Sequence, residues 1–387
     1  MVANNLPQGV SQSMISLRIG HPDPTTLFTL ELQAAVQSML NSPRSVAALQ
    51  YGPEQGSPNL INVLVERLNR VQGLSLRPEN LMIVGGSTGA VDMIARLYAG
   101  SGAIVLIEAP TYVDAIHIFR DHGIELYSIP VDDSGLIVTE LEKALHKLRA
   151  NGKSPAFLYT IPTFQNPSGV TLPLDRRLEI LRIAKDYGLL IVEDDVYRDL
   201  SFGAVPPANF YNLSSGENVL SIGSFSKIFA PGFRLGWLVG SAAAIQRCVN
   251  CGTTQMGGGA NPFVANIVAE FCEKGYLEPH IARLCRLYQE RCEVTLTALQ
   301  RYMPDGVRWT VPQGGFFIWL TLPEHIFAHD VQQAALDQNV SVALGRGFFA
   351  TPTEGEHNLR IAFSFAPLKD LDAGIKILGQ VVEGVRA

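Results

Sequence analysis

Short apolar runs alternate with helical patterns through the middle of the chain. The runs are four or five residues long and lie at 81–84, 103–107, 125–129, 156–160, 189–192, 219–222 and 236–239. Runs of this length are typical of strands in a mostly parallel sheet that is buried on both faces. Between them, segments such as 139–149 and 174–187 repeat apolar residues every three or four positions, which predicts helices. The pattern therefore predicts a doubly wound α/β fold.

The pattern changes after Asn261-Pro262. A long helical stretch is expected from 263 to about 302, suited to bridging two domains. Beyond it, short strands at 316–320 and 359–363 with helices at 330–339 and 368–385 predict a smaller α+β domain. We expect a large domain at 49–287, a small domain at 288–387 and an N-terminal segment at 1–48 that associates with the small domain.

Composition and charge exclude several classes of protein. Apolar residues make up 47% of the 387 residues and charged residues 17%, which excludes a largely disordered chain. The net charge of -6, without a long run of Lys or Arg, argues against nucleic acid as a partner. Residues 1–9 do not resemble a signal peptide and no apolar stretch is long enough to span a bilayer, so we expect a cytoplasmic protein with no membrane partner. The five cysteines, among them Cys248-x-x-Cys251 without a second pair at zinc-site spacing, indicate reduced thiols and no metal site.

Among the eight lysines, Lys227 alone follows a buried strand, in Gly223-Ser224-Phe225-Ser226-Lys227. The carboxyl ends of strands are where open α/β sheets bind ligands. Desolvation lowers the pKa of an amine, and a neutral amine forms an imine with an aldehyde. Lys227 is therefore the candidate for covalent cofactor binding.

Two segments suit a phosphate. Arg234 follows Lys227 by seven residues, after a Pro-Gly turn that can bring its guanidinium back toward the lysine. Gly85-Gly86-Ser87-Thr88-Gly89 follows the strand at 81–84 and leads into a helix expected at 90–97, where backbone donors and the helix N-terminus favour an anion. A plain capped turn is the alternative for this second segment.

Three carboxylates end the strand at 189–192, in Glu193-Asp194-Asp195-Val196-Tyr197. A buried carboxylate needs a cationic partner, and a protonated pyridine nitrogen would be one. A metal site is the alternative, but no histidine lies in the segment. At two further strand ends, Asn166 precedes a proline that restricts it, and Tyr112 is placed to stack on an aromatic ring. A core position is the alternative for Tyr112, because a lone tyrosine is more often a core residue.

These segments together resemble the class I/II aminotransferases, the fold type I enzymes that use pyridoxal 5'-phosphate (PLP). The resemblance covers nearly the whole chain, and its most specific elements are Asn166-Pro167-Ser168-Gly169, Asp194-Asp195-Val196-Tyr197 and Ser224-Phe225-Ser226-Lys227. It implies a large domain with a mostly parallel sheet between helices, and a smaller α+β domain. The spacing from Lys227 to Arg234 is most similar to the corresponding spacing in 2-aminoadipate aminotransferases and in the aminotransferase-like domains of MocR-type regulators.

The resemblance implies a role for each residue that matches a family motif. Lys227 would be the Schiff-base lysine, Asp194 would partner the pyridine nitrogen, Asn166 and Tyr197 would bond the ring hydroxyl oxygen, and Tyr112 would stack on the ring. The phosphate would be surrounded by Gly86, Ser87, Thr88, Ser224, Ser226 and Arg234. Tyr51 would reach the cofactor of a partner subunit, which implies a homodimer. Arg360 would hold the substrate α-carboxylate, and Gly20 lies where the N-terminal segment covers the site.

By resemblance, we expect ping-pong transfer of an amino group from an amino acid to a 2-oxo acid, with 2-oxoglutarate as the acceptor. Cofactor contacts alone leave open another PLP reaction, such as β-elimination or decarboxylation. A non-catalytic sensing domain of the MocR kind is a further alternative, which we expect to be weaker because family-like sequence starts near Ile15 and the net charge is acidic. His21 and Leu344-Gly345-Arg346-Gly347 depart from the subgroup pattern. The amino donor and the roles of His21, Arg18 and Arg346 stay open.

Overall fold

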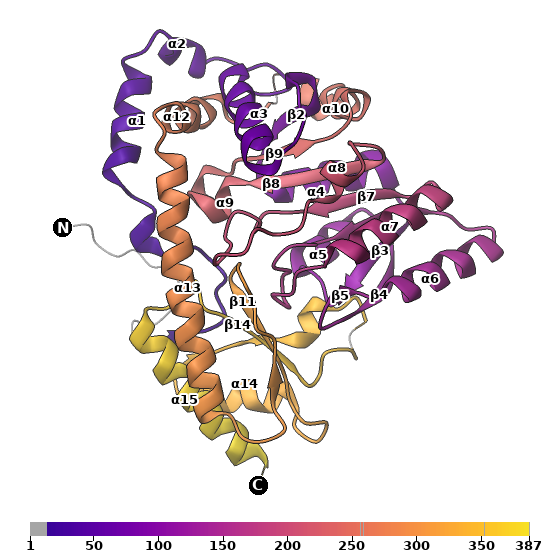
Figure 1. Cartoon of the computed structure of the whole chain (residues 1–387), viewed down its shortest axis with the longest axis vertical. Coiled ribbons are helices and arrows are strands. Elements are labelled where there is room, and N and C mark those ends of the chain that lie inside the picture. Colours follow the sequence, from indigo (N-terminus) through magenta and orange to yellow (C-terminus); the bar gives the residue numbers. More distant parts are fainter. Residues whose placement is uncertain (1–13, 256, 258, 352, 387) are drawn as a thin grey trace.

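The computed structural model describes residues 14–255, 257, 259–351 and 353–386. In it, the apolar runs between 81 and 239 form strands of one eight-stranded sheet (Figure 1). The strands are β2 (Leu81–Val84), β3 (Ile104–Ala109), β4 (Glu125–Asp132), β5 (Gly135–Leu136), β6 (Pro155–Thr160), β7 (Leu190–Asp194), β8 (Val219–Ser224) and β9 (Gly236–Val239). Their order is β2-β9-β8-β7-β6-β3-β4-β5. Neighbours from β8 through β4 are parallel, whereas β9 and β5 pair antiparallel. The predicted mostly parallel sheet is confirmed.

Helices flank this sheet because their apolar stripes face it (Figure 1). They include α3 (Pro58–Gln72), α4 (Gly86–Ile94), α5 (Val113–Asp121), α6 (Val138–Ala150), α7 (Leu174–Tyr187), α8 (Phe210–Leu213) and α10 (Ala242–Val249). The short helix α11 (Gly252–Gln255) follows α10 and contacts it. In α6 the buried residues recur every three or four positions, at Leu141, Ala144, Leu145 and Leu148. Strand β8 is buried along its whole length, as expected for a strand covered on both faces.

The prediction of a single long helix from 263 to about 302 is wrong in one respect, because the chain forms two helices there. These are α12 (Pro262–Glu273) and α13 (Leu277–Tyr302). Between them Gly275 has φ +74°, a left-handed conformation that glycine adopts without a steric penalty and that ends the first helix. Helix α13 then runs beside the large sheet and continues along the small domain, where it packs against α15 (Leu368–Arg386) (Figure 1).

The small domain contains a four-stranded antiparallel sheet of β10 (Arg308–Trp309), β11 (Phe317–Thr321), β14 (Asn358–Ala362) and β13 (Ala343–Leu344). Helices α14 (Ala328–Asp337) and α15 complete this predicted α+β unit. Among the described residues, no helix combines the length and apolar character needed to cross a membrane.

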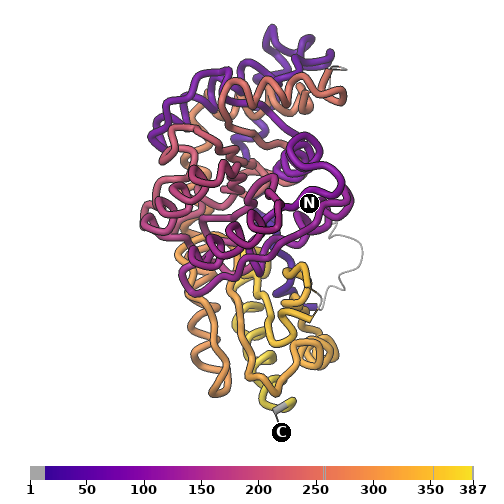
Figure 2. The backbone as a smooth tube through the Cα atoms, turned by 90° about the vertical axis from the view of Figure 1, so that its right-hand side faces the viewer, coloured from indigo at the N-terminus to yellow at the C-terminus, as the bar shows by residue number. Residues whose placement is uncertain are grey.

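The described part of the N-terminal segment contacts both ends of the molecule. Strand β1 (Ile15–Ser16) pairs with β12 (Val340–Ser341) beside the small sheet. Helices α1 (Leu30–Leu40) and α2 (Arg44–Ala48) instead pack against α12, at the end opposite the small domain (Figures 1 and 2). Residues 1–13 of the predicted segment lie outside the described residues. The stretch between β1 and α1 therefore passes the junction of the two domains.

Candidate active site

A cavity of about 400 Å³ lies where the carboxyl ends of β6, β7 and β8 meet the small domain. The sequence-predicted residues that line it are Gly20, Ser87, Thr88, Tyr112, Asn166, Asp194, Tyr197, Ser226, Lys227, Arg234 and Arg360. Gly86 and Ser224 do not line it, but Gly86 lies against the Arg234 guanidinium and Ser224 is hydrogen-bonded to Ser226. Tyr51 is not brought to this cavity, and its side chain is 81% exposed.

Lys227 reaches the cavity from a short helix, α9 (Phe225–Ile228), that begins where β8 ends. The Ser224 hydroxyl starts this helix by accepting a hydrogen bond from the Ser226 backbone N–H (3.0 Å). Burial and the nearby charge of Arg360 together lower the pKa of Lys227 to about 8, against an opposing effect of Asp194. A substantial fraction of the amine is therefore neutral and nucleophilic just above neutral pH.

Asp194 at the end of β7 carries an unsatisfied buried oxygen. Its Oδ2 accepts a hydrogen bond from the Tyr159 hydroxyl (2.7 Å), whereas its Oδ1 has no hydrogen-bond partner among the described residues. Burial raises the pKa of Asp194 to about 6, although the bond from Tyr159 opposes that change. A buried carboxylate oxygen without a partner is costly, so this atom is suited to a cationic or N–H donor in the cavity.

The two neighbouring carboxylates do not line the cavity. Glu193 accepts hydrogen bonds from the backbone N–H groups of Phe210 (2.8 Å) and Tyr211 (3.0 Å), and thus holds the start of α8. Asp195 pairs with Arg198 (3.4 Å). The described residues include no group of three or more His, Cys, Asp or Glu arranged to hold a metal ion. The segment therefore offers one carboxylate to the cavity.

The opposite end of the cavity suits an anion. Helix α4 begins at Gly86 and not at the expected residue 90, so Ser87 and Thr88 lie in its first turn, where backbone N–H groups lack helical partners. The Arg234 guanidinium lies over Gly86, where a Cβ would be 3.2 Å from its Nη2 atom. Arg234 itself has φ +48°, a conformation that non-glycine residues adopt at a cost of about 1–3 kcal/mol and that is typical of functional sites.

Arg360 connects the two domains across the cavity. From β14 its Nη1 donates to Asn166 Oδ1 (2.9 Å) and its Nη2 to the Arg18 carbonyl oxygen (2.9 Å). The guanidinium carbon lies 4.2 Å from the Phe317 ring centre and 4.8 Å from that of Phe348. Its Nε is buried without a partner among the described residues, and burial lowers the pKa of Arg360 to about 10. The group is held in place and retains an unused donor.

The loop that carries Asn166 is held by the buried Glu108 carboxylate at the end of β3. Glu108 accepts hydrogen bonds from Thr160 Oγ1 (2.5 Å), the Ile161 backbone N–H (3.2 Å) and Gln165 Nε2 (2.8 Å). Burial raises the pKa of Glu108. Since Gln165 also donates to the Pro110 carbonyl oxygen (2.9 Å), this network positions the loops of Asn166 and of Tyr112 together.

Sequence reasoning missed several residues that shape the cavity. Tyr159 binds Asp194 from the neighbouring strand, and Phe317 and Phe348 hold Arg360. Each resembles an ordinary core aromatic in the sequence, and only the pairing of distant strands places it at the site. The Glu108-Ala109-Pro110 sequence was a weak signal, because Glu108 is a carboxylate at the end of a buried strand.

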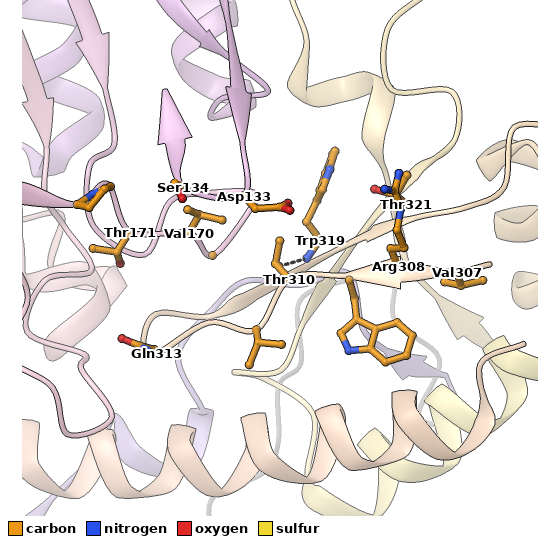
Figure 3. Close-up of a pocket in the computed structure, with 14 residues that line it drawn as sticks. Asp133, Ser134, Val170, Thr171, Val307, Arg308, Thr310, Gln313, Trp319 and Thr321 are labelled. Atoms are coloured by element: carbon orange, nitrogen blue, oxygen red, sulfur yellow. Dashed lines mark hydrogen bonds between the residues drawn. The ribbon is translucent and has the colours of Figure 1, made fainter. Parts of the chain in front are cut away.

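A wider hollow of about 710 Å³ lies between the β4–β5 turn and strands β10 and β11 (Figure 3). Asp133 and Arg308 line it from opposite sides, and the Trp319 backbone N–H beside them donates to Thr310 Oγ1 (3.0 Å). None of the residues predicted to bind cofactor or substrate lines it. Volume therefore does not identify the chemical site in this protein.

Comparisons with known proteins agree with this geometry. Aromatic-amino-acid aminotransferase 1 of Thermococcus litoralis is 35% identical over 373 residues, which are 96% of this chain and 89% of that protein. The structure of Pyrococcus horikoshii kynurenine aminotransferase in complex with PMP has a TM-score of 0.92 at 34% identity and covers 97% of this chain and 92% of its own. LysN, the alpha-aminoadipate aminotransferase of Thermus thermophilus complexed with N-(5'-phosphopyridoxyl)-L-leucine, has a TM-score of 0.88 at 32% identity, with 97% and 93% covered.

The family "Aminotransferase class I and II" matches residues 12–378, almost the whole chain. The resemblance that the motifs indicated is thereby confirmed. This chain belongs to the class I and II aminotransferase family.

Proposed function

We propose that this protein is an aminotransferase that uses pyridoxal 5'-phosphate to move the amino group of an L-amino acid to a 2-oxo acid. Family membership supports the reaction class, and the cavity supports the cofactor. The observation that carries the proposal is that one cavity holds a buried amine of lowered pKa together with two unsatisfied buried polar atoms, Asp194 Oδ1 and Arg360 Nε. The acceptor is 2-oxoglutarate, and both half-reactions use the same site in a ping-pong mechanism.

The donors and acceptors of the cavity fit the cofactor from end to end. The phosphate would lie on the first turn of α4, bound by Gly86, Ser87, Thr88, Ser224, Ser226 and Arg234. The pyridine nitrogen would donate to Asp194 Oδ1, the buried acceptor without a partner. Asn166 and Tyr197 would hold the ring hydroxyl oxygen, and Tyr112 would stack on the ring. When bound, pyridoxal phosphate supplies an aldehyde and a ring that withdraws electrons from the substrate Cα.

Lys227 has two tasks in this scheme. Its Nζ atom holds the cofactor covalently between catalytic cycles. With the substrate amine bound in the cavity, the free Nζ would accept the proton from the substrate Cα and would later donate it back within the same cavity. A pKa near 8 suits both directions, because a group transfers protons best when its pKa is close to the working pH. Asp194, as a carboxylate, keeps its ring partner protonated.

Arg360 binds the substrate α-carboxylate. Its guanidinium is clamped between Phe317 and Phe348, and its unused Nε donor together with an Nη group forms the planar fork that binds a carboxylate at two points. Gly20 lines the same cavity beside Phe317, and a Cβ there would come within 2.5 Å of the Phe317 ring. A glycine at this position therefore lets the N-terminal segment lie close over the substrate.

The protein acts as a homodimer in this proposal, with Tyr51 reaching the cofactor of the partner subunit. Tyr51 and several apolar side chains between residues 28 and 49 are exposed to an unusual degree: Phe28 by 72%, Leu30 by 79%, Val46 by 79% and Leu49 by 75%. Apolar surface of this kind is typical of a protein interface. We also propose a cytoplasmic location and the domain division 1–48, 49–287 and 288–387.

The direct test mixes purified protein, pyridoxal phosphate, an amino acid and 2-oxoglutarate, and measures glutamate. We expect glutamate and a 2-oxo acid in equal amounts. Release of ammonia or carbon dioxide in place of glutamate would identify an elimination or a decarboxylation. Tight binding of amino acid without any turnover would identify a sensing domain. A screen of amino donors against this one acceptor then defines the physiological donor class.

A further inference from the structure

A second cavity of about 480 Å³ adjoins the active-site cavity on the side of the small domain. The two share Gly20, His21, Val113 and Arg360 in their linings. The second cavity continues past Arg360 to Arg18 on the N-terminal segment and Arg346 in the 3-10 turn η5 (Gly345–Phe348). A substrate held at Arg360 would therefore extend its side chain into this space.

The lining of this second cavity carries unbalanced positive charge. It includes three arginines and, among the described residues that form it, no Asp or Glu. Within the described parts of the chain, the side chains of Arg18 and Arg346 make no hydrogen bond or ion pair, unlike Arg67 or Arg182, which pair with carboxylates. The charge of Arg18 contributes to the lowered pKa of Arg360, so these two cations repel each other, while the charge of Asp114 in the adjoining cavity acts in the opposite direction. An anionic ligand would relieve this repulsion.

The backbone holds both arginines next to the α-carboxylate site. Arg360 Nη2 donates to the Arg18 carbonyl oxygen (2.9 Å), which fixes residue 18 beside the clamped guanidinium. On the other side, the Thr111 backbone N–H donates to the Phe348 carbonyl oxygen (2.8 Å), which ties η5 to the loop before Tyr112. The two arginines thus project from segments whose positions depend on Arg360 and on the large domain.

Apolar side chains line the same cavity between these charges. Ile19, Val113 and Leu344 are among them. A ligand that combines a carboxylate at Arg360, a methylene spacer against this wall and a second carboxylate at the far end matches every part of the lining.

We propose that Arg18 and Arg346 form an anion subsite that binds the distal carboxylate of dicarboxylic amino acids and 2-oxo acids. The assignment rests on the proposed aminotransferase function, because it places the α-carboxylate at Arg360. It makes Arg18 and Arg346 specificity-determining residues that recognise the substrate side chain and take no part in the reaction at Cα.

The kinetic test compares 2-aminoadipate with norleucine, which has the same number of carbons and a methyl group in place of the distal carboxylate. Arg18→Gln and Arg346→Gln should each lower kcat/KM for 2-aminoadipate by about tenfold or more, the factor of one charge-assisted hydrogen bond. Norleucine kinetics should stay at the wild-type value. Arg308→Gln is the control, since Arg308 is an exposed arginine that lines the other hollow. Equal losses for both donors, or no loss for 2-aminoadipate, would overturn the proposal.

A binding experiment decides the point without turnover. Adipate and hexanoate are titrated into the holoenzyme by calorimetry, and into the Arg18→Gln/Arg346→Gln double variant. The wild type should bind adipate at least about tenfold more tightly than hexanoate, and the double variant should bind both alike. Retention of the adipate preference in the double variant would refute the subsite. Since this result does not require catalysis, failure of the subsite is distinguishable from failure of the proposed reaction.

Discussion

Replacing Asp194 with asparagine should affect the cofactor-free protein and the holoenzyme in opposite directions. Burial raises the pKa of this carboxyl from 3.8 to about 6. At a pH above both values, that difference corresponds to roughly 3 kcal/mol of stability lost by keeping the carboxylate ionised in the folded protein. Asparagine has nearly the same shape, carries no charge and can still accept the hydrogen bond of Tyr159. The cofactor-free variant should therefore be more stable than the wild type, by up to about 3 kcal/mol.

The pH dependence of this stabilisation has a defined sign. The folded protein binds a proton at Asp194 more tightly than the unfolded chain does, because its pKa is raised. The destabilisation of the cofactor-free wild type by its ionised Asp194 is thus fully present above about pH 6. It disappears as the pH falls from 6 toward 3.8. Urea unfolding of both cofactor-free proteins at pH 8 and at pH 5 measures it, and the advantage of the variant should be smaller at pH 5.

In the holoenzyme the same substitution would remove the proposed anionic partner of the pyridine nitrogen. Loss of one member of a buried charge pair typically costs about 3–5 kcal/mol, which corresponds to a loss of roughly a hundredfold to several thousandfold in cofactor affinity or turnover. Spectrophotometric titration with pyridoxal phosphate measures the affinity. Asp195→Asn is the matched control, because Asp195 pairs with Arg198 and does not line the cavity. Equal losses in the two variants, or no gain in stability of cofactor-free Asp194→Asn, would refute the reasoning.

Three further predictions concern other residues of the site. Lys227→Ala should abolish the visible absorbance of covalently bound cofactor and nearly all turnover, and a cofactor adduct that borohydride still reduces in this variant would contradict the assignment. Arg360→Lys should raise KM for every amino donor and lower kcat/KM by about ten- to a hundredfold, since lysine lacks the planar fork; an apolar donor that is spared would show that Arg360 does not bind the common α-carboxylate. Mixing Tyr51→Phe with Lys227→Ala should form hybrid dimers with one fully native site, and hybrids no more active than the mean of the two parents would exclude a role for Tyr51 across the subunit boundary.

The local pattern of apolar and polar residues was sufficient to predict the main strands and helices. The strand predicted at 81–84 coincides with β2 and the helix predicted at 174–187 with α7, because apolar runs and helical periodicity are properties of neighbouring residues. The predicted ends of the elements were less accurate. Helix α4 begins at Gly86, four residues before the predicted start, and Gly275 divides the predicted long helix. At both places a glycine with positive φ decides the backbone path, and the apolar pattern does not report it.

By itself, the sequence determined which side chains could do chemistry and on which strand ends they lie, since parallel strands bring their carboxyl ends to one edge. It also singled out Lys227 by elimination. Only the tertiary structure decided which of two neighbouring carboxylates faces the cavity, since Asp194 and Asp195 each keep one buried oxygen without a hydrogen-bond partner among the described residues. Residue type does not distinguish Asp194 from Asp195, but strand pairing turns one toward Tyr159 and the cavity and the other toward Arg198. Likewise, Arg18 and Arg360 lie 342 positions apart and meet because β14 and the N-terminal segment pack together. Burial and partnership are set by contacts between distant residues, and those contacts exist only once the chain is folded.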